Sequence, residues 1–391
     1  MSTARRDGDK IVLPGLATAH SHAFQRGLRG RTQRRAAEEG SFWSWRNLMY
    51  AFAERLDPAS IYDLSRLAYA ELALAGVTAV GEFHYVQHQP DGTPYDDRIA
   101  LADAVVRAAR DVGLRVSLLR VVYQRGGFQG GAPVEPDPVQ RRFCDRRLED
   151  ALADVEAIAA RFADDPCVGV GVAPHSVRAV SREWIGEAAA FAKAKALPFH
   201  MHVSEQTREL DECRAEHGVT PVQLLADIGA LDERFVAVHA THLEPGEARL
   251  LGSAGAFACL CRTTERDLGD GLCDAAELVS AGVRLCTGVD SHAVSDPFEE
   301  ARAIELDDCS RARARHVAAD APALLDAATE GGYAAIGMQS ACGQDRVVLD
   351  ATDAALDGAD DSMLEDAVVF GAGPRAVVRV EVAGRVIFER G

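Results

Sequence analysis

The chain alternates short apolar runs rich in β-branched residues with longer segments rich in alanine and leucine, and this alternation limits the folds open to it. The runs predict eight strands, over residues 10–22, 76–85, 114–123, 168–176, 197–206, 234–242, 255–265 and 283–292. Apolar residues recur at helical spacing between them, as in segments 59–75, 97–112, 145–163 and 181–196. Alternating strands and helices form parallel sheets, and eight such units favour an α/β fold of the (β/α)₈ barrel type.

The pattern changes after residue 293. Two more helical stretches, 296–318 and 320–337, precede two runs of alternating residues, 346–350 and 376–389, which are typical of short antiparallel strands. The acidic stretch 350–366 is expected to be a solvated surface segment. We therefore expect a barrel over residues 13–340 and a small β appendage built from residues 1–12 and 341–391.

The charge balance narrows the classes of partner. The 391-residue chain carries a formal charge of −18, and 48% of its residues are hydrophobic. Nucleic acids and anionic membrane surfaces both need a basic footprint, so neither is expected as a partner. Only Lys10, Lys193 and Lys195 are lysines, so arginine must recognise any anionic substrate.

Cysteine usage and the N-terminal residues bear on the compartment. The nine cysteines include no C-x-x-C pair, which argues against a disulfide framework or a structural zinc knuckle. The first ten residues lack the apolar region of a signal peptide, and no apolar run reaches membrane-spanning length. These observations predict a cytoplasmic enzyme.

Chemically able side chains gather where the predicted strands end. Seven of the eight strands finish in such residues, namely His20, His22, His84, Tyr85, His175, His202, Glu205, His239, His242, Thr264, Glu265 and Asp290. Barrel enzymes build their active sites at the carboxyl ends of the strands. Isolated histidines are mostly structural, but packing does not explain this concentration at corresponding positions.

Five of these residues suit a metal ion. His20 and His22 point to the same side of one strand, because side chains two residues apart share a face. A lone His-x-His is more often structural, but His202, His239 and Asp290 bring nitrogen and oxygen donors from three other strand ends. Such donors suit zinc, and iron or manganese would also fit. Spacing alone leaves open whether His200 or His202 is the ligand.

Several segments together resemble a known family. They are LPGLATAHSHAFQRGLRGR, SFWSWRNLMY, GEFHY, APHSVRAV, HMHVSEQ, VHATHL, TTERDLGDG and GVDSH. In order and spacing they resemble the amidohydrolase superfamily and, within it, the N-formimino-L-glutamate deiminase family. The resemblance covers roughly residues 12–340 and implies a barrel with a β-sandwich appendage, and a homodimer.

The resemblance also implies roles for the strand-end residues. His20, His22, His202 and Asp290 would hold one zinc ion per chain, while Glu205 and His239 would lie around the catalytic water, whose proton Asp290 can accept. The predicted fourth strand offers neither the lysine nor the glutamate that bridges two metals in other members. A mononuclear site is therefore expected.

The reaction implied is the hydrolysis of N-formimino-L-glutamate to N-formyl-L-glutamate and ammonia, a step of histidine degradation. Resemblance points to five substrate contacts, namely Gln25, Arg46, Tyr85, His175 and Arg178. Arg46 is expected in an aromatic-rich loop after the first barrel strand. The two arginines would recognise the carboxylates of this small anionic substrate.

Three departures from the family pattern and two rival functions complete the prediction. Only about a dozen residues precede the first barrel strand, so a reduced β appendage is expected. Arg262 stands where proline is expected, which would add a charge near the mouth of the site, and Val289 stands where serine is expected. A guanine-type aminohydrolase would use the same metal chemistry with a different pocket. A non-catalytic barrel that binds a ligand is the alternative of another class, but it gives no reason for so many converging polar groups.

Overall fold

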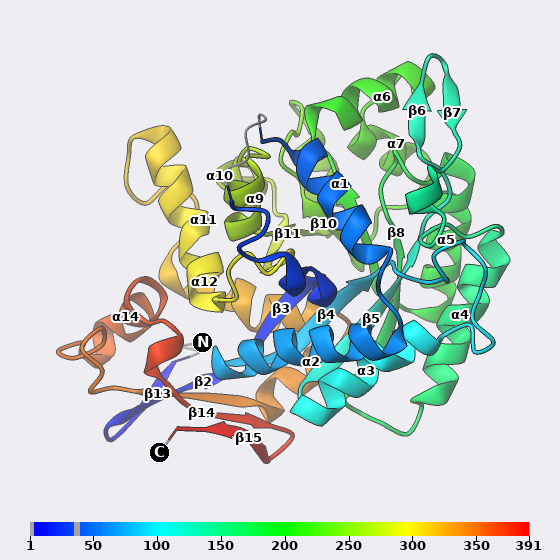
Figure 1. Ribbon diagram of the computed structural model, residues 1–391. Helices are drawn as coiled ribbons and strands as arrows, with labels where there is room; N and C mark the ends of the chain where they lie inside the picture. The colour runs from blue at the N-terminus through cyan, green and yellow to red at the C-terminus, as the bar shows by residue number, and fades with distance from the viewer. Residues whose placement is uncertain (1–3, 35–39, 391) are drawn as a thin grey trace.

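The parallel barrel predicted from the sequence is confirmed (Figure 1). The computed structural model describes residues 4–34 and 40–390. Its barrel strands are β3 (Leu16–Ser21), β4 (Val77–His84), β5 (Arg115–Val122), β8 (Val168–Pro174), β9 (Phe199–Val203), β10 (Phe235–His239), β11 (Phe257–Leu260) and β12 (Arg284–Thr287). They pair in chain order, and a parallel bridge between Ser21 and Asp290 joins the last strand to the first.

Helices surround the barrel strands (Figure 1). They are α2 (Pro58–Leu74), α3 (Ala100–Val112), α4 (Leu148–Arg161), α5 (Arg182–Lys195), α6 (Thr207–His217), α7 (Pro221–Asp227), α8 (Glu247–Ser253), α10 (Ala275–Ser280), α11 (Pro297–Ala312), α12 (Ala321–Ala328) and α13 (Glu330–Ala335). Local sequence fixes where several of them begin. At α2, the Asp57 side chain accepts the Ser60 backbone N–H, and Pro58 occupies the first helical position, where it loses no hydrogen bond.

The chain ends form one antiparallel sheet beside the barrel. In spatial order its strands are β1 (Arg5–Asp7), β2 (Lys10–Pro14), β13 (Arg346–Asp350), β14 (Val377–Val382) and β15 (Arg385–Glu389). Alternate residues such as Ile11 and Leu349 are buried, because the strand period places them on the covered face. The appendage is thus a single sheet, packed with α14 (Leu364–Gly371) nearby, instead of the two layers of a sandwich. Residues 1–3 and 391 of the expected terminal segments lie outside the described part.

Two of the predicted strands each contain two elements. The run over residues 10–22 is shared between the two sheets and changes from one to the other at Gly15, where an added Cβ would lie 2.5 Å from Thr78 Oγ1. The run over residues 255–265 ends at Leu260, because α9 (Arg262–Leu268) begins there. The prediction that Thr264 and Glu265 end a strand is therefore wrong.

The remaining elements lie in the connections. They are the hairpin of β6 (Gly127–Gln129) and β7 (Ala132–Val134), helix α1 (Phe42–Ala53), and the short 3₁₀ helices η1 (Ala23–Leu28), η2 (Pro138–Gln140), η3 (Gln339–Gln344), η4 (Asp361–Met363) and η5 (Pro374–Ala376). Arg46 lies on α1, so its placement in a loop was wrong. Within residues 4–34 and 40–390, no helix is long and apolar enough to cross a membrane.

Candidate active site

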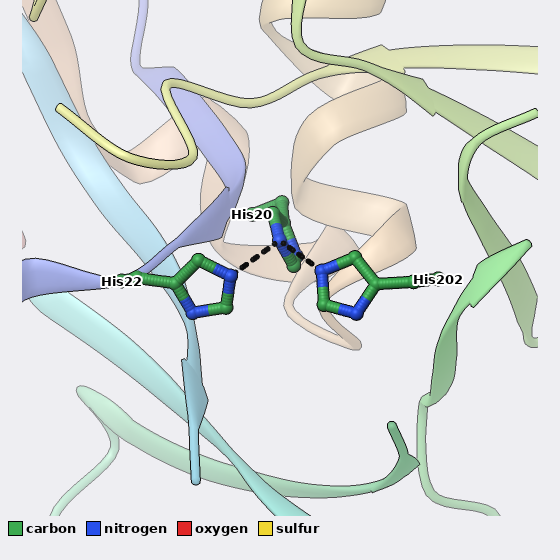
Figure 2. A group of neighbouring side chains, drawn as sticks. All are labelled: His20, His22 and His202. Atoms are coloured by element: carbon green, nitrogen blue, oxygen red, sulfur yellow. Dashed lines mark hydrogen bonds between the residues drawn. The ribbon is translucent and has the colours of Figure 1, made fainter. Parts of the chain in front are cut away.

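Three histidine side chains converge at the carboxyl end of the barrel. Figure 2 shows His20 and His22 from β3 and His202 from β9 turning their rings toward one another. His20 Nε2 lies 3.2 Å from His22 Nε2 and 3.2 Å from His202 Nε2. All three side chains are buried. This arrangement could hold a metal ion.

The other ring nitrogens explain why these three fit a cation. His22 Nδ1 lies 2.9 Å from the Phe83 carbonyl oxygen, and His202 Nδ1 lies 3.1 Å from the His175 carbonyl oxygen. Only an Nδ1–H can donate to a carbonyl, so the Nε2 atoms carry the lone pairs that face each other. Burial lowers the pKa of His20 to about 3 and also lowers the pKa of His22 and His202. The rings are therefore neutral, which is the form that binds metals.

Asp290 adds an oxygen donor beside these rings. Its Oδ1 lies 3.5 Å from His20 Nε2 and 3.3 Å from His22 Nε2. Burial opposes ionisation, but hydrogen bonding to His20 and the positive charge on His239 hold the pKa of Asp290 well below its usual range. Asp290 is therefore a carboxylate, and its second oxygen, Oδ2, lies 3.8 Å from His239 Nε2.

His239 and Glu205 stand next to this centre. The Nε2 atom of His239 lies 3.8 Å from Glu205 Oε1, and the Nδ1 atom lies 3.3 Å from Glu265 Oε1. Burial acts against a charged ring, but these two carboxylates and Asp290 raise the pKa of His239 to about 10. Burial also raises the pKa of Glu205. A protonated His239 thus faces the carboxylates of Glu205 and Asp290 beside the converging histidines.

The backbone is strained where these side chains leave the strands. His239 has a φ of 71° and Asp290 a φ of 50°, in the left-handed region that non-glycine residues seldom adopt. Ser204, which precedes Glu205, has a φ of 53°. Such outliers persist only where the surroundings enforce them, and they cluster at functional sites. Here they direct side chains from three strand ends toward one point.

A cavity opens over the histidines. It is lined by His22, Gln25, Phe42, Trp45, Arg46, Met49, Tyr50, Tyr85, His175, Arg178, His202, Glu205, His239, Leu268 and Asp290. Every residue predicted for metal binding, catalysis or substrate contact is in this set except His20, whose side chain is wholly buried beneath it. The structure thus brings all the predicted site residues to one place.

Two arginines give the cavity its positive charge. The guanidinium carbons of Arg46 and Arg178 lie 4.5 and 5.6 Å from the centre of the Trp43 ring, close enough for cation–π attraction. The Nε atoms of both are buried without a hydrogen-bond partner in the described part of the chain, and neither guanidinium has a carboxylate within 4.0 Å there. An acidic protein thus keeps two arginines in this cavity without a directly paired carboxylate among the described residues.

The neutral polar residues predicted for substrate contact form part of the same wall. Gln25 Nε2 donates to the Tyr85 hydroxyl at 2.7 Å, and that hydroxyl lies 3.4 Å from the Met49 sulfur. The Gln25 Oε1 atom is buried without a partner among the described residues. His175 packs against His202, with ring centres 4.8 Å apart. These groups offer hydrogen-bonding capacity that the protein itself does not use.

Sequence reasoning missed one wall of the cavity and misplaced one charge. Phe42, Trp45 and Met49 line the cavity with Arg46, and their spacing of three and four residues on α1 is the signal that could have shown it. Arg262 does not lie at the mouth. Its side chain is fully buried and paired with Glu265, because it begins α9 under the strand ends.

Other departures from the predicted pattern lie away from the cavity. Val289 is buried in the core. His84 is buried but is not among the cavity residues, and His200, the rival of His202, bonds through Nε2 to the Ala335 carbonyl oxygen at 2.8 Å. Thr264 bonds to Ser291. His200 and His202 share one side of β9, but His202, nearer the carboxyl end of the strand, is the one whose ring faces His20.

Comparisons with known proteins agree with this fold. Residues 11–387 match the amidohydrolase family. The formimidoylglutamate deiminase of Pseudomonas aeruginosa is 39% identical over 97% of this chain and 85% of that protein. The 8-oxoguanine deaminase of the same organism is 30% identical over 73% of this chain and 61% of that protein.

Comparison with solved structures also points to the amidohydrolases. The crystal structure of an amidohydrolase from Brucella melitensis superposes with a TM-score of 0.87 and 32% identity, over 99% of this chain and 90% of that one. A barrel with histidine and carboxylate donors at its strand ends defines a class of hydrolases that work with a bound metal. The chain belongs to the amidohydrolase family.

Proposed function

We propose that the protein is a metal-dependent deiminase that hydrolyses N-formimino-L-glutamate to N-formyl-L-glutamate and ammonia, as a step of histidine catabolism. It would act as a hydrolase on a carbon–nitrogen bond outside peptides. The observation that carries this proposal is that Arg46 and Arg178, in the wall of a cavity whose floor can bind a metal, have no carboxylate within 4.0 Å among the described residues. The 39% identity to a formimidoylglutamate deiminase supports it.

The two arginines suit a substrate with two carboxylates. Guanidinium groups bind carboxylates through parallel hydrogen bonds, and these bonds are strong where water is excluded. Arg178 is only 7% exposed, so an anion that reaches it leaves most of its hydration behind. A purine offers no such pair of anions. The pocket chemistry therefore favours the acidic amidine over a guanine-type base.

We infer that one zinc ion would be held by His20, His22, His202 and Asp290. Neutral imidazoles and one carboxylate match the ligands of catalytic zinc, and iron(II) or manganese(II) would accept the same donors. The Nε2 atoms of His22 and His202 carry lone pairs, and each lies 3.2 Å from His20 Nε2, which fits a shared cation. When bound, the metal would supply Lewis acidity that makes hydroxide available from water at neutral pH.

Protein groups would then handle the protons. The formimino carbon gains the oxygen of water and loses ammonia, so both protons of that water must be passed to the departing nitrogen. Asp290 has a second carboxylate oxygen that can accept the first. Glu205, whose pKa is raised by burial, can carry a proton to the nitrogen, and His239 can stabilise the developing negative oxygen.

The test is product identification with the zinc-loaded protein. Incubation with N-formimino-L-glutamate should release ammonia in equal amount to N-formyl-L-glutamate, identified by mass. Guanine and 8-oxoguanine, offered in parallel, test the aminohydrolase alternative that the 30% identical relative suggests. Deamination of a purine without turnover of the amidine would overturn the proposal. No turnover of any compound by fully metallated protein would favour the non-catalytic barrel.

Further expectations accompany this proposal. We propose that the enzyme works as a homodimer on a small anionic substrate, without nucleic acid or membrane partners, in the cytoplasm. Light scattering after size-exclusion chromatography would give the mass in solution, to be compared with 41.8 kDa for one chain. The division into a barrel over residues 13–340 and an appendage from residues 1–12 and 341–391 likewise stays a proposal.

A further inference from the structure

A buried chain of three side chains leads from α9 to the active-site histidine. His239 Nδ1 lies 3.3 Å from Glu265 Oε1, and Glu265 Oε2 lies 3.3 Å from Arg262 Nη1. The side chains of Arg262 and Glu265 are 0% exposed, and that of His239 is 1% exposed. Neither Arg262 nor Glu265 lines the cavity. His239 is the cavity residue to which this pair is linked by a hydrogen bond.

The two members of this chain on α9 are fixed to the backbone. Glu265 Oε1 also accepts the Cys261 backbone N–H at 2.9 Å, so the carboxylate is held at the start of α9. Arg262 Nη2 donates to the Cys273 carbonyl oxygen at 3.4 Å. The ion pair thus connects β11, α9 and the segment before α10. A carboxylate buried this deeply needs a partner, because an unpaired buried charge is strongly unfavourable.

We propose that the Arg262–Glu265 pair is the positioning device for His239: Arg262 fixes the Glu265 carboxylate, and that carboxylate fixes the His239 ring with Nε2 facing the cavity. The orientation of the His239 ring needs such support, because the His239 backbone is strained, with a φ of 71°. Its Nε2 then lies 3.8 Å from both Glu205 and Asp290. A proline at position 262, as in the family pattern, would have no guanidinium to offer.

This inference rests on the proposed function for its kinetic test. Glu265→Leu removes both the charge and the acceptor, and kcat on N-formimino-L-glutamate is expected to fall by about 100-fold with KM within about twofold. Glu265→Gln keeps an oxygen that can accept from Nδ1–H and should recover most of that loss. Arg262→Gln leaves Glu265 without its ion pair and should lower kcat by about 10-fold.

A matched variant separates positioning from stability. Arg115 is 2% exposed and forms an equally buried pair with Asp345 at 2.7 Å, at the amino end of β5 and far from the cavity. Arg115→Gln should lower Tm as Arg262→Gln does but leave kcat unchanged. Metal content is measured for every variant. Equal losses of kcat in Glu265→Leu and Glu265→Gln, or in Arg262→Gln and Arg115→Gln, would overturn the inference.

A second readout needs no substrate. A proton on Nδ1 that bonds to a buried carboxylate should give a low-field proton NMR signal, coupled to ¹⁵N in histidine-labelled protein and absent from His239→Gln. This signal should disappear in Glu265→Leu and persist in Arg115→Gln. An unchanged signal in Glu265→Leu would refute the positioning role. If the wild-type protein fails to turn over the amidine, the proposed function falls, and this measurement still decides the inference.

Discussion

Individual atoms decide what this site can bind. The histidines of the metal centre are neutral because they are buried, and they present Nε2 because backbone carbonyl oxygens accept from Nδ1 of His22 and His202. The arginines of the cavity carry charge that no described carboxylate within 4.0 Å compensates. The neutral histidines lie at the floor of the cavity, and the arginines lie in its wall. Such a site suits an anion whose carboxylates contact the arginines while its reactive group reaches the histidines.

The cationic wall predicts a specific kinetic change. Arg178→Gln should raise KM for N-formimino-L-glutamate by about 100-fold, because a charge-assisted pair worth on the order of 3 kcal/mol is lost. Steady-state assays of ammonia release measure this. Arg214→Gln is the control, since Arg214 is also an arginine near the cavity helices but is paired with Glu244 on the exposed side of α6. Similar KM values for Arg178→Gln and the wild type would remove Arg178 from the substrate site.

Glu82 predicts how stability changes with pH. This carboxyl accepts from Ser21 Oγ at 2.6 Å and from the Ala23 backbone N–H at 2.7 Å, and burial raises its pKa to about 7. Between about pH 4.5 and 7 the folded protein keeps a proton that the unfolded chain releases, so the free energy of unfolding should fall as pH rises. The effect is on the order of 3 kcal/mol.

Glu82→Gln removes this titration while keeping an acceptor for the Ala23 N–H. Urea unfolding at pH 5 and pH 7.5 should show a smaller loss of stability for the variant than for the wild type. Both proteins are measured at the same free metal concentration. Effects of pH that do not involve Glu82 are then the same in both, and they cancel when the two stability curves are subtracted. Parallel pH curves for the two proteins would show that Glu82 titrates as it does in the unfolded chain.

Whole elements follow from sequence where a repeating pattern defines them. The barrel strands could be predicted because apolar β-branched runs alternate with helical segments, and strand ends such as His202 and Asp290 then fall on one rim. Helix α9 could not be predicted, because the apolar run continues through Cys261 and gives no sign of the helix that begins at Arg262. Helix α1 was hidden for the opposite reason, since its cavity face mixes aromatic residues with Arg46.

The connection after β12 predicts a steric effect on the metal site. At Gly288 an added Cβ would lie 2.8 Å from His20 Cβ and 2.9 Å from Cys261 Sγ, distances that force a neighbour to shift. Gly288→Ala should therefore displace His20 or Asp290 and weaken zinc binding by about 10-fold or more. Competition with a chromogenic chelator measures the zinc affinity.

Gly186 supplies the matched glycine. It lies on α5, and nothing lies within 4 Å of an added Cβ there. Gly186→Ala should leave zinc affinity unchanged and stabilise the fold by roughly 0.5–1 kcal/mol, because alanine favours helix. Unchanged zinc affinity in Gly288→Ala would mean that the strand ends tolerate the added methyl group without moving the ligands.

Across the whole molecule, the candidate metal ligands join distant parts of the barrel. His20 and His22 belong to β3, His202 to β9, and Asp290 to the segment after β12 that bridges to Ser21. A metal held by these side chains ties the first strand to the last and to a strand on another side of the barrel. Metal binding should therefore stabilise the closed barrel as well as serve the reaction.

Thermal unfolding tests this coupling and settles the choice between two histidines. A ligand that binds only the folded state at 100 times its Kd adds about 2.7 kcal/mol to the free energy of unfolding, so zinc should raise Tm and a chelator should lower it. His202→Gln should lose this response, because its Nε2 faces His20 at 3.2 Å. His200 lies on the same strand and the same side, but its Nε2 bonds to the Ala335 carbonyl oxygen. His200→Gln should lower Tm yet keep the rise with zinc, and the opposite pattern would make His200 the ligand.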